Sequence, residues 1–363
     1  MKKYAWIGAG ALLLLATLLY FAGTKLQNDK SGSESMLEPL GNRAATAPSK
    51  DSAGTLVNNE PNVEDISITD TKKQSRGEPV LSDAVKALLG LDEKKHNYQT
   101  LLAAIDELDY ELSQDDIEAL MEMLKYPNSR FPGKMRPIEI NAVKNDVLDK
   151  LLRQKRLPEM IGFQLAEMAE NEENDPVWRD YCVQFMQPFY ERASTERKEH
   201  GAESVSQASG LQNAGNTDAL QVIHGAMFQA LDERNTTIAG TSLIGLELLS
   251  RTHEEFDREI IINKANEIAA DETASASSRM TGLRLASQVA QKQGAGTAET
   301  TADTARFLAQ TGETVLLRSA AIVTLGEIGT PEDRELLQAY QLADNKQIAS
   351  AATMALEKMD AKN

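Results

Sequence analysis

The side chains best suited to chemistry are few in this chain and widely spaced. Among 363 residues there are one cysteine, Cys182, and four histidines: His96, His200, His224 and His253. No histidine has a second ligand at the spacing of a metal site. No HExxH, GxSxG or glycine-rich phosphate-binding motif occurs. The sequence therefore predicts no catalytic, metal-binding or cofactor-binding residues, and a protein that is not an enzyme.

Cys182 and two acidic clusters are interpreted as structural features without a chemical role. Cys182 lies in a predicted helix beside aromatic residues, whereas a nucleophilic thiol needs an exposed, electropositive setting. We expect a buried structural thiol, and a single cysteine rules out an internal disulfide framework. Residues 106–111 and 170–175 are rich in carboxylates but lack the loop spacing and glycine of a calcium-binding EF-hand. They are predicted to be solvated acidic faces.

Charge is concentrated in the C-terminal part of the chain. The formal charge is −17 at pH 7. Residues 1–26 contribute +3 and residues 27–79 contribute −3, so residues 80–363 carry all of the −17. A surface this acidic repels phosphate backbones, which argues against nucleic acid as a partner. Basic protein partners, bound cations or a need for solubility explain this charge better.

Helices must position these side chains. The helical pattern is clearest in residues 314–359. An apolar stripe at helical spacing, formed by Leu317, Ala321, Leu325 and Ile328, predicts the first helix. Gly329 ends it, and Thr330-Pro331 supplies a cap and first-turn proline for the next. A third helix begins the pattern again near Ile348. The distance along the chain between the first and third helices is typical of a two-helix repeat.

The same register extends backwards through residues 217–363. Taking Ala239, Arg279, Arg318 and Ala349 as equivalent positions divides this region into copies of one repeat. Two apolar positions then recur in every copy: Leu246, Ala286, Leu325 and Leu356, and Leu249, Val289, Ile328 and Met359. We predict that these residues form the repeat core. The middle copies are longer than the last, and their extra residues are expected to hold a long helix over 253–270 and a loop at 294–304.

The segment from Arg318 to Glu332 resembles a known family. Arg318-Ser-Ala-Ala, the Leu-Gly-Glu-Ile-Gly sequence that starts at Leu325, and Pro331-Glu are similar to HEAT repeats of phycobilisome lyases. Glu313 takes the place where that family usually has an aspartate, and Ala349 departs from the family's arginine. The resemblance implies an all-α fold, an α-solenoid of HEAT-like repeats. It does not imply lyase activity, because such repeats occur in unrelated proteins.

Residues 80–193 are predicted to form a first helical-repeat block. Its clearest feature is an aromatic face with spacings of three, four and four: Trp178, Tyr181, Phe185 and Phe189. This face is interpreted as core, the alternative being an exposed recognition stripe. Arg179 aligns with Arg318 in the repeat register. Residues 194–216 are polar and are predicted to be a loop between the two blocks, either a neutral insertion, a partner contact or a flexible joint.

The N-terminal residues indicate a membrane segment and a tether. Residues 4–23 carry no charge and follow Lys2 and Lys3, so residues 1–26 are predicted to be an uncleaved signal-anchor helix. The aromatic residues placed to anchor it at the two interfaces are Tyr4, Trp6, Tyr20 and Phe21. A cleaved signal, giving a secreted protein, is the alternative. Residues 27–79 are polar and are predicted to be a disordered linker.

These observations predict a membrane-tethered, extracytoplasmic scaffold that binds protein partners through helical repeats. The lysines at the N-terminus favour a single-pass protein of a bacterial inner membrane, with its C-terminal region in the periplasm. The alternatives are an accessory subunit of a periplasmic enzyme complex, as lyase-type repeats allow, or an assembly factor or chaperone. The identity of the partner does not follow from the residues.

Overall fold

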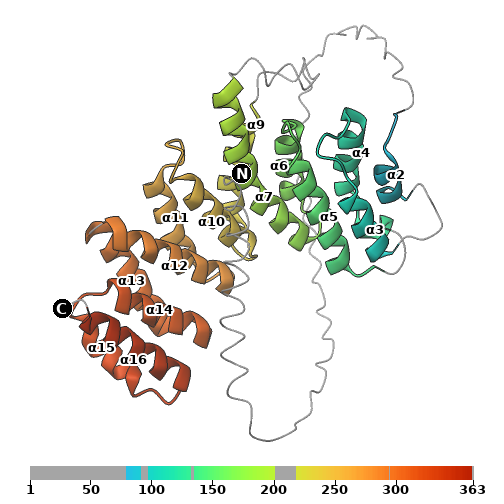
Figure 1. The fold of residues 1–363 in the computed structure, drawn as a ribbon. Coiled ribbons are helices and arrows are strands. Elements are labelled where there is room, and N and C mark those ends of the chain that lie inside the picture. Colours follow the sequence, from blue (N-terminus) through green and yellow to red (C-terminus); the bar gives the residue numbers. More distant parts are fainter. Residues whose placement is uncertain (1–78, 91–96, 132–134, 201–217, 294, 362–363) are drawn as a thin grey trace, which may run out of the picture. The chain divides into compact units, whose positions relative to one another are not determined.

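The structure is a computed structural model that describes residues 79–363, apart from 91–96, 132–134, 201–217, 294 and 362–363. The chain divides into two units, Met1–Lys73 and Gln74–Asn363, and every described residue lies in the second. Within the described residues the secondary structure is helical, without strands. The first helices (Figure 1) are α2 (Asp83–Leu88), α3 (Tyr98–Asp106), α4 (Gln114–Leu124), η1 (Asn128–Arg130), α5 (Pro137–Leu152), α6 (Met160–Glu170) and α7 (Pro176–His200). They are followed by α9 (Ala219–Gln229), η2 (Ala230–Asp232), α10 (Ile238–Leu249), α11 (Arg258–Ala270), α12 (Ala276–Gln293), α13 (Ala295–Thr311), α14 (Val315–Ile328), α15 (Asp333–Gln341) and α16 (Lys346–Asp360).

The helices from α4 onward pack as hairpins in two layers. One layer contains α5, α7, α10, α12, α14 and α16, each in contact with the next. The other contains the helices that precede them in the chain, with α6 against α9 and α11 against α13. Each helix therefore contacts mainly its hairpin partner and its neighbours in the adjoining repeats, which is the arrangement of an all-α repeat array.

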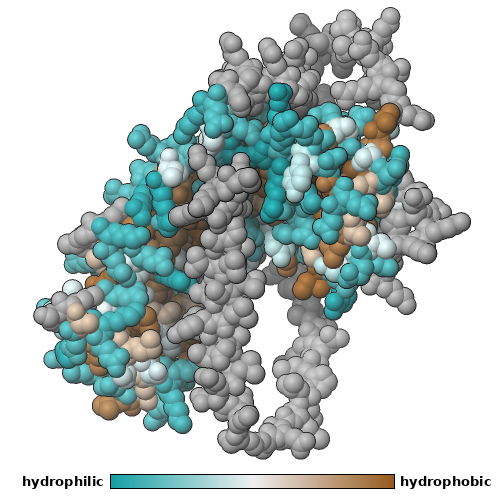
Figure 2. Space-filling view, viewed as in Figure 1, coloured by the Kyte–Doolittle hydropathy of each residue, from teal (hydrophilic) through white to brown (hydrophobic). Residues whose placement is uncertain are grey.

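Side chains from both layers form the core. One buried cluster runs from Val85 in α2 to Val289 in α12. A second runs from Ala269 in α11 to Met359 in α16. Both clusters draw on α11 and α12, so apolar packing continues through this hairpin. The described surface seen in Figure 2 is mostly hydrophilic, which agrees with the acidic composition.

Helix starts are fixed locally by side-chain caps. Asp257 accepts hydrogen bonds from the backbone of Glu259 and Ile260 at the start of α11. Thr314 caps α14 in the same way, and Asn345 caps α16. Each cap satisfies an amide that the first turn of a helix leaves without a partner, so the sequence places these starts directly.

Three arginines make one and the same hydrogen bond in three different repeats. Arg179, Arg279 and Arg318 each donate from Nε to a carbonyl at the C-terminal end of the preceding helix. The acceptors are the carbonyl oxygens of Ala169, Ala269 and Ala309, at 2.7, 3.0 and 3.1 Å. The last carbonyls of a helix have no partner within it and lie at the negative end of its dipole. A guanidinium, buried in Arg179 and Arg279 and partly buried in Arg318, supplies both a hydrogen bond and a compensating charge there.

Two of these arginines also link one repeat to the next. Arg179 forms an ion pair with Glu233 in the loop before α10, and Arg279 forms one with Glu313 before α14. Between them, Arg234 donates to Asp271 at 3.0 Å in the loop before α12. These polar contacts follow the hairpin loops along the array.

Two glycines allow neighbouring helices to approach closely. A Cβ on Gly282 of α12 would lie 2.4 Å from the carbonyl oxygen of Ala265 in α11. A Cβ on Gly326 of α14 would lie 2.5 Å from Cα of Ala355 in α16. Backbone atoms have little freedom to yield, so these positions require glycine for packing.

Several sequence-based boundaries differ from the structure. Helix α7 extends to His200, into the segment 194–216 that was predicted to be a loop. Its last turns are held by Arg197, which binds Asp218, and by Arg192, which binds Glu196 and the carbonyl of Leu152. These contacts are tertiary or charge-based and leave no apolar period for the sequence pattern to detect.

The other differences lie in the C-terminal array. Helix α15 begins at Asp333, with Glu332 at the N-cap, and not at the Thr330-Pro331 pair, because Thr330 donates to the carboxylate of Asp333. Helix α11 begins at Arg258, because Asp257 caps it, and not near residue 253. The loop expected over residues 294–304 is occupied by the start of α13, Ala295–Thr311. Ala302 and Ala305 are buried in this helix. Small side chains pack well against α12 and α14 but give a weak apolar stripe, which explains the missed helix.

Candidate functional site

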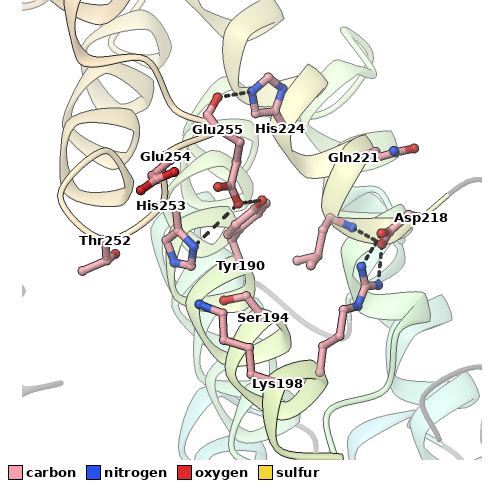
Figure 3. A pocket seen from close by; sticks show the side chains of 12 residues that line it. Tyr190, Ser194, Lys198, Asp218, Gln221, His224, Thr252, His253, Glu254 and Glu255 are labelled. Carbon is pink, nitrogen blue, oxygen red and sulfur yellow. Dashed lines mark hydrogen bonds and ion pairs between the residues drawn. The ribbon is translucent and has the colours of Figure 1, made fainter. Parts of the chain in front are cut away.

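A pocket of about 720 Å³ lies where α7, α9 and the loop between α10 and α11 meet. Figure 3 shows side chains from all three segments around it. Its walls are formed by Tyr190, Ser194, Arg197 and Lys198 of α7, by Leu220, Gln221 and His224 of α9 with the preceding Asp218, and by Thr252, His253, Glu254 and Glu255 of the loop. The pocket thus joins groups that lie far apart along the chain.

Glu255 is held in place by two other segments of the pocket. The hydroxyl of Tyr190 donates to Glu255 Oε1 at 2.6 Å, and these two side chains point toward each other in Figure 3. His224 Nε2 lies 3.3 Å from the backbone carbonyl oxygen of Glu255. His253 Nδ1 lies 3.6 Å from Glu255 Oε1. The loop between α10 and α11 is therefore tied to both α7 and α9.

The hydrogen bond from Tyr190 favours the ionised form of Glu255. It holds the pKa of Glu255 below its usual value, so the carboxylate is ionised at neutral pH. Burial, together with the neighbouring carboxylate, raises the pKa of Tyr190 and keeps the phenol a donor. The site consequently contains a fixed carboxylate whose side chain is 50% exposed.

Aromatic rings pack beneath this carboxylate. The ring centroids of Tyr190 and Phe256 lie 4.8 Å apart in an edge-to-face arrangement, and those of Tyr190 and His253 lie 5.2 Å apart. The His224 ring lies 4.8 Å from Phe256. Edge-to-face pairs at this separation are favourable. These contacts pack three rings that line the pocket, those of Tyr190, His224 and His253, around Phe256.

The opposite side of the pocket contains a neutralised ion pair. Both terminal nitrogens of Arg197 bind the carboxylate of Asp218, one of them at 2.7 Å. The bond from Arg197 lowers the pKa of Asp218, which also caps α9 by accepting from the amide of Leu220. Burial raises the pKa of Glu159, whose carboxylate lies 3.8 Å from Arg197. Arg197 and Asp218 hold α7 against α9.

The nucleophilic side chains Ser194 and Cys182 are respectively engaged and buried. The hydroxyl of Ser194 donates to the carbonyl of Glu191 in its own helix, at 3.0 Å, and so is not directed at a base. Cys182 is fully buried, and burial raises the pKa of its thiol. Within the described part of the chain, no group of three or more histidine, cysteine or acidic side chains is placed to hold a metal ion.

The predicted repeat-core residues lie on α10, α12, α14 and α16, one pair to each helix. Five are fully buried or nearly so: Leu246, Leu249, Ala286, Val289 and Leu325. Leu356 and Met359 of α16 are also buried, whereas Ile328 at the end of α14 is half-buried. None of the eight lines the pocket, so they position the site only by building the array.

The aromatic face of α7 packs against the core. Trp178 and Phe189 are fully buried, while Tyr181 and Phe185 are partly buried against the same core. This agrees with core packing for the face. Arg179 makes the hydrogen bond that Arg318 makes, as their alignment in the repeat register suggested.

The predicted membrane anchor, including Tyr4, Trp6, Tyr20 and Phe21, lies outside the described residues. The predicted linker, residues 27–79, lies outside them too except for its last residue. Among the helices that the structure describes, none has the length and apolarity needed to cross a bilayer.

Sequence reasoning missed this pocket and its two histidines. His224 and His253 are well separated in the chain and looked unrelated, yet both rings pack with Phe256. No short-range spacing signals such a meeting, because it depends on how α9 packs beside α7 and the α10–α11 loop. The only local hint was the run of polar residues 252–255 directly after an apolar helix.

Comparison with known proteins adds little. No family model and no curated protein matches this chain. Among solved structures, the chain is similar to human deoxyhypusine hydroxylase in complex with glycerol, at 13% sequence identity and a TM-score of 0.29. The match covers 77% of this chain and 95% of that chain. A TM-score this low carries no argument, and the helix contacts alone show the repeat array.

Proposed function

We propose that this protein is a non-catalytic scaffold, a HEAT-like α-solenoid tethered to a membrane on its extracytoplasmic side, that binds a protein partner. The observation that carries the proposal is the pocket between α7, α9 and the α10–α11 loop. Its polar groups are already held by Tyr190, His224 and Arg197, so a partner would meet a preorganised surface. Preorganisation lowers the entropic cost of binding.

The architecture supports this role. Stacked helical hairpins present long continuous surfaces that suit extended protein partners. The recurring bond from an arginine to the end of the preceding helix, made by Arg179, Arg279 and Arg318, supports the HEAT-like character suggested by residues 318–332.

A chaperone or assembly factor would need a contiguous apolar groove. The large exposed apolar side chains of the described residues are dispersed over separate helices, for example Ile138 on α5, Ile260 on α11 and Met354 on α16. Dispersed apolar residues are ordinary on protein surfaces. They do not favour this alternative, and partner recognition through the pocket is the better-supported proposal.

Site-specific photo-crosslinking tests the scaffold function. A photoreactive residue in place of Gln221, an exposed residue at the pocket, would be introduced into the full chain in its own membranes. The matched control carries the same residue at Glu299, exposed on α13 and not among the pocket residues. We expect a discrete protein adduct at position 221 and none of the same mass at 299. No adduct at 221, or the same adduct at both positions, would contradict docking at the pocket.

The membrane tether needs its own experiment. We expect the full chain to stay with the membrane pellet after alkaline carbonate extraction, and a chain lacking residues 1–26 to be released. Release of the full chain would refute the anchor and favour the cleaved-signal alternative. Protease added outside the inner membrane should digest the C-terminal region.

A further inference from the structure

We propose that the pocket receives a basic side chain, lysine or arginine, from an extended segment of the protein partner, and that this cation sits against the carboxylate of Glu255. The inference rests on the proposed scaffold function and names the chemistry by which its pocket recognises a partner. It follows from the charges that line the pocket, from how Glu255 is held, and from the charge of the molecule around it.

Negative charge is in excess inside the pocket. Its walls contain three carboxylates, those of Asp218, Glu254 and Glu255, and two permanent cations, Arg197 and Lys198. Arg197 is engaged with Asp218 through a two-pronged contact. Among the described residues of the pocket walls, Lys198 is the permanent cation left for Glu254 and Glu255, and its side chain is exposed. The imidazole of His253, with Nδ1 3.6 Å from Glu255 Oε1, is another basic group beside Glu255. One uncompensated carboxylate is left for a ligand.

Glu255 is the carboxylate best placed to bind the cation. Its Oε1 accepts from Tyr190, its backbone carbonyl is held by His224, and half of its side chain is accessible. A carboxylate fixed by one hydrogen bond and still open to solvent can accept further bonds from an ammonium or guanidinium group. Glu254 is exposed at the rim, where it adds charge with less geometric definition.

The size of the pocket and the charge of the chain fit a peptide segment. A volume of about 720 Å³ exceeds what one side chain fills, so neighbouring residues of the partner would lie in it as well. Residues 80–363 carry the whole formal charge of −17. Such a field attracts a basic segment over long distances and raises its association rate at low ionic strength.

The test measures binding of a fluorescent hexa-arginine peptide to the purified full chain by anisotropy, with hexaglutamate as the opposite probe. Glu255→Gln keeps an oxygen that can accept from Tyr190 and removes only the charge. We expect it to weaken hexa-arginine binding about three- to tenfold. Lys198→Gln removes the opposing cation and should strengthen binding by a few-fold. Opposite effects from two neighbouring residues would not arise from damage to the fold.

Control variants account for non-specific attraction to an acidic protein. Glu335→Gln on α15 and Lys292→Gln on α12 make the same charge changes at exposed residues away from the pocket. We expect both to alter the affinity less than about twofold, since exposed charges far from a ligand are screened by salt. Equal effects at pocket and control positions would overturn the proposal, as would absent binding of hexa-arginine or tighter binding of hexaglutamate.

The result can be separated from failure of the scaffold function. If position 221 crosslinks a partner but hexa-arginine does not bind, only the inference about a basic side chain fails. If hexa-arginine binds with the expected pattern but no partner crosslinks in membranes, the pocket binds cations and the scaffold function fails.

Discussion

Replacing Arg279 with methionine tests whether the array depends on its buried arginines. The Arg279 side chain is 2% exposed and donates to the carbonyl of Ala269 at 3.0 Å. Losing a charge-assisted hydrogen bond to a buried carbonyl costs about 1.5–3 kcal/mol. The partner in the ion pair, Glu313, is 48% exposed and can recover water. An ion pair of this kind contributes only about 0–1 kcal/mol.

Methionine keeps much of the volume of the arginine stem, so the cavity contribution is small. We therefore expect Arg279→Met to lower the free energy of unfolding by about 2–3 kcal/mol, and Glu313→Gln by less than about 1 kcal/mol. The ratio between the two variants separates the helix-end bond from the ion pair.

Hydrogen exchange followed by mass spectrometry locates the effect, and urea unfolding followed by circular dichroism gives its size. Repeats interact mainly with their neighbours, so protection should fall in α11 to α14 and stay unchanged in α5 to α7. Equal destabilisation by both substitutions would show that the ion pair dominates. A uniform loss of protection along the whole array would refute nearest-neighbour coupling.

Three further predictions concern packing, charge and reactivity. Gly282→Ala should destabilise the fold by about 1–3 kcal/mol, because the added Cβ would meet backbone atoms. Gly225→Ala, where nothing lies within 4 Å of the added Cβ, should stabilise the fold by about 0.5–1 kcal/mol. Equal urea midpoints for the two variants would contradict this prediction. Lys144 is 2% exposed, donates to the carbonyl of Tyr126, and burial lowers its pKa to about 8. Between about pH 8 and 10.5, Lys144 is protonated in the unfolded chain but mostly neutral in the folded chain. The free energy of unfolding therefore rises with pH over this range, by up to about 3 kcal/mol. Urea titrations should show that rise in the wild type and lose it in Lys144→Met, and the same slope in both would refute it. The thiol of Cys182 should react with a disulfide reagent at least about 100-fold more slowly in the folded than in the urea-unfolded chain; rapid labelling of the folded protein would contradict its burial.

Local sequence signals predicted most of the helical framework. Apolar stripes such as the one ending at Ile328 act within one or two turns of a helix. Their physics is contained in neighbouring residues, so one chain is enough to detect them. The alignment of Arg179 with Arg318 belongs to the same class, because both sit at one position of a repeat.

The sequence by itself determined an all-α fold for the residues that the structure describes, an acidic C-terminal part and a register of buried positions. Only the tertiary structure decided that Tyr190, His224 and Glu255 meet in one pocket, since the lateral packing of α7, α9 and the α10–α11 loop sets those distances. The extension of α7 to His200 was decided in the same way, by contacts such as the one from Arg197 to Asp218. Helical periodicity is a short-range property of the chain, whereas a pocket between repeats depends on packing across segments that no spacing along the sequence records.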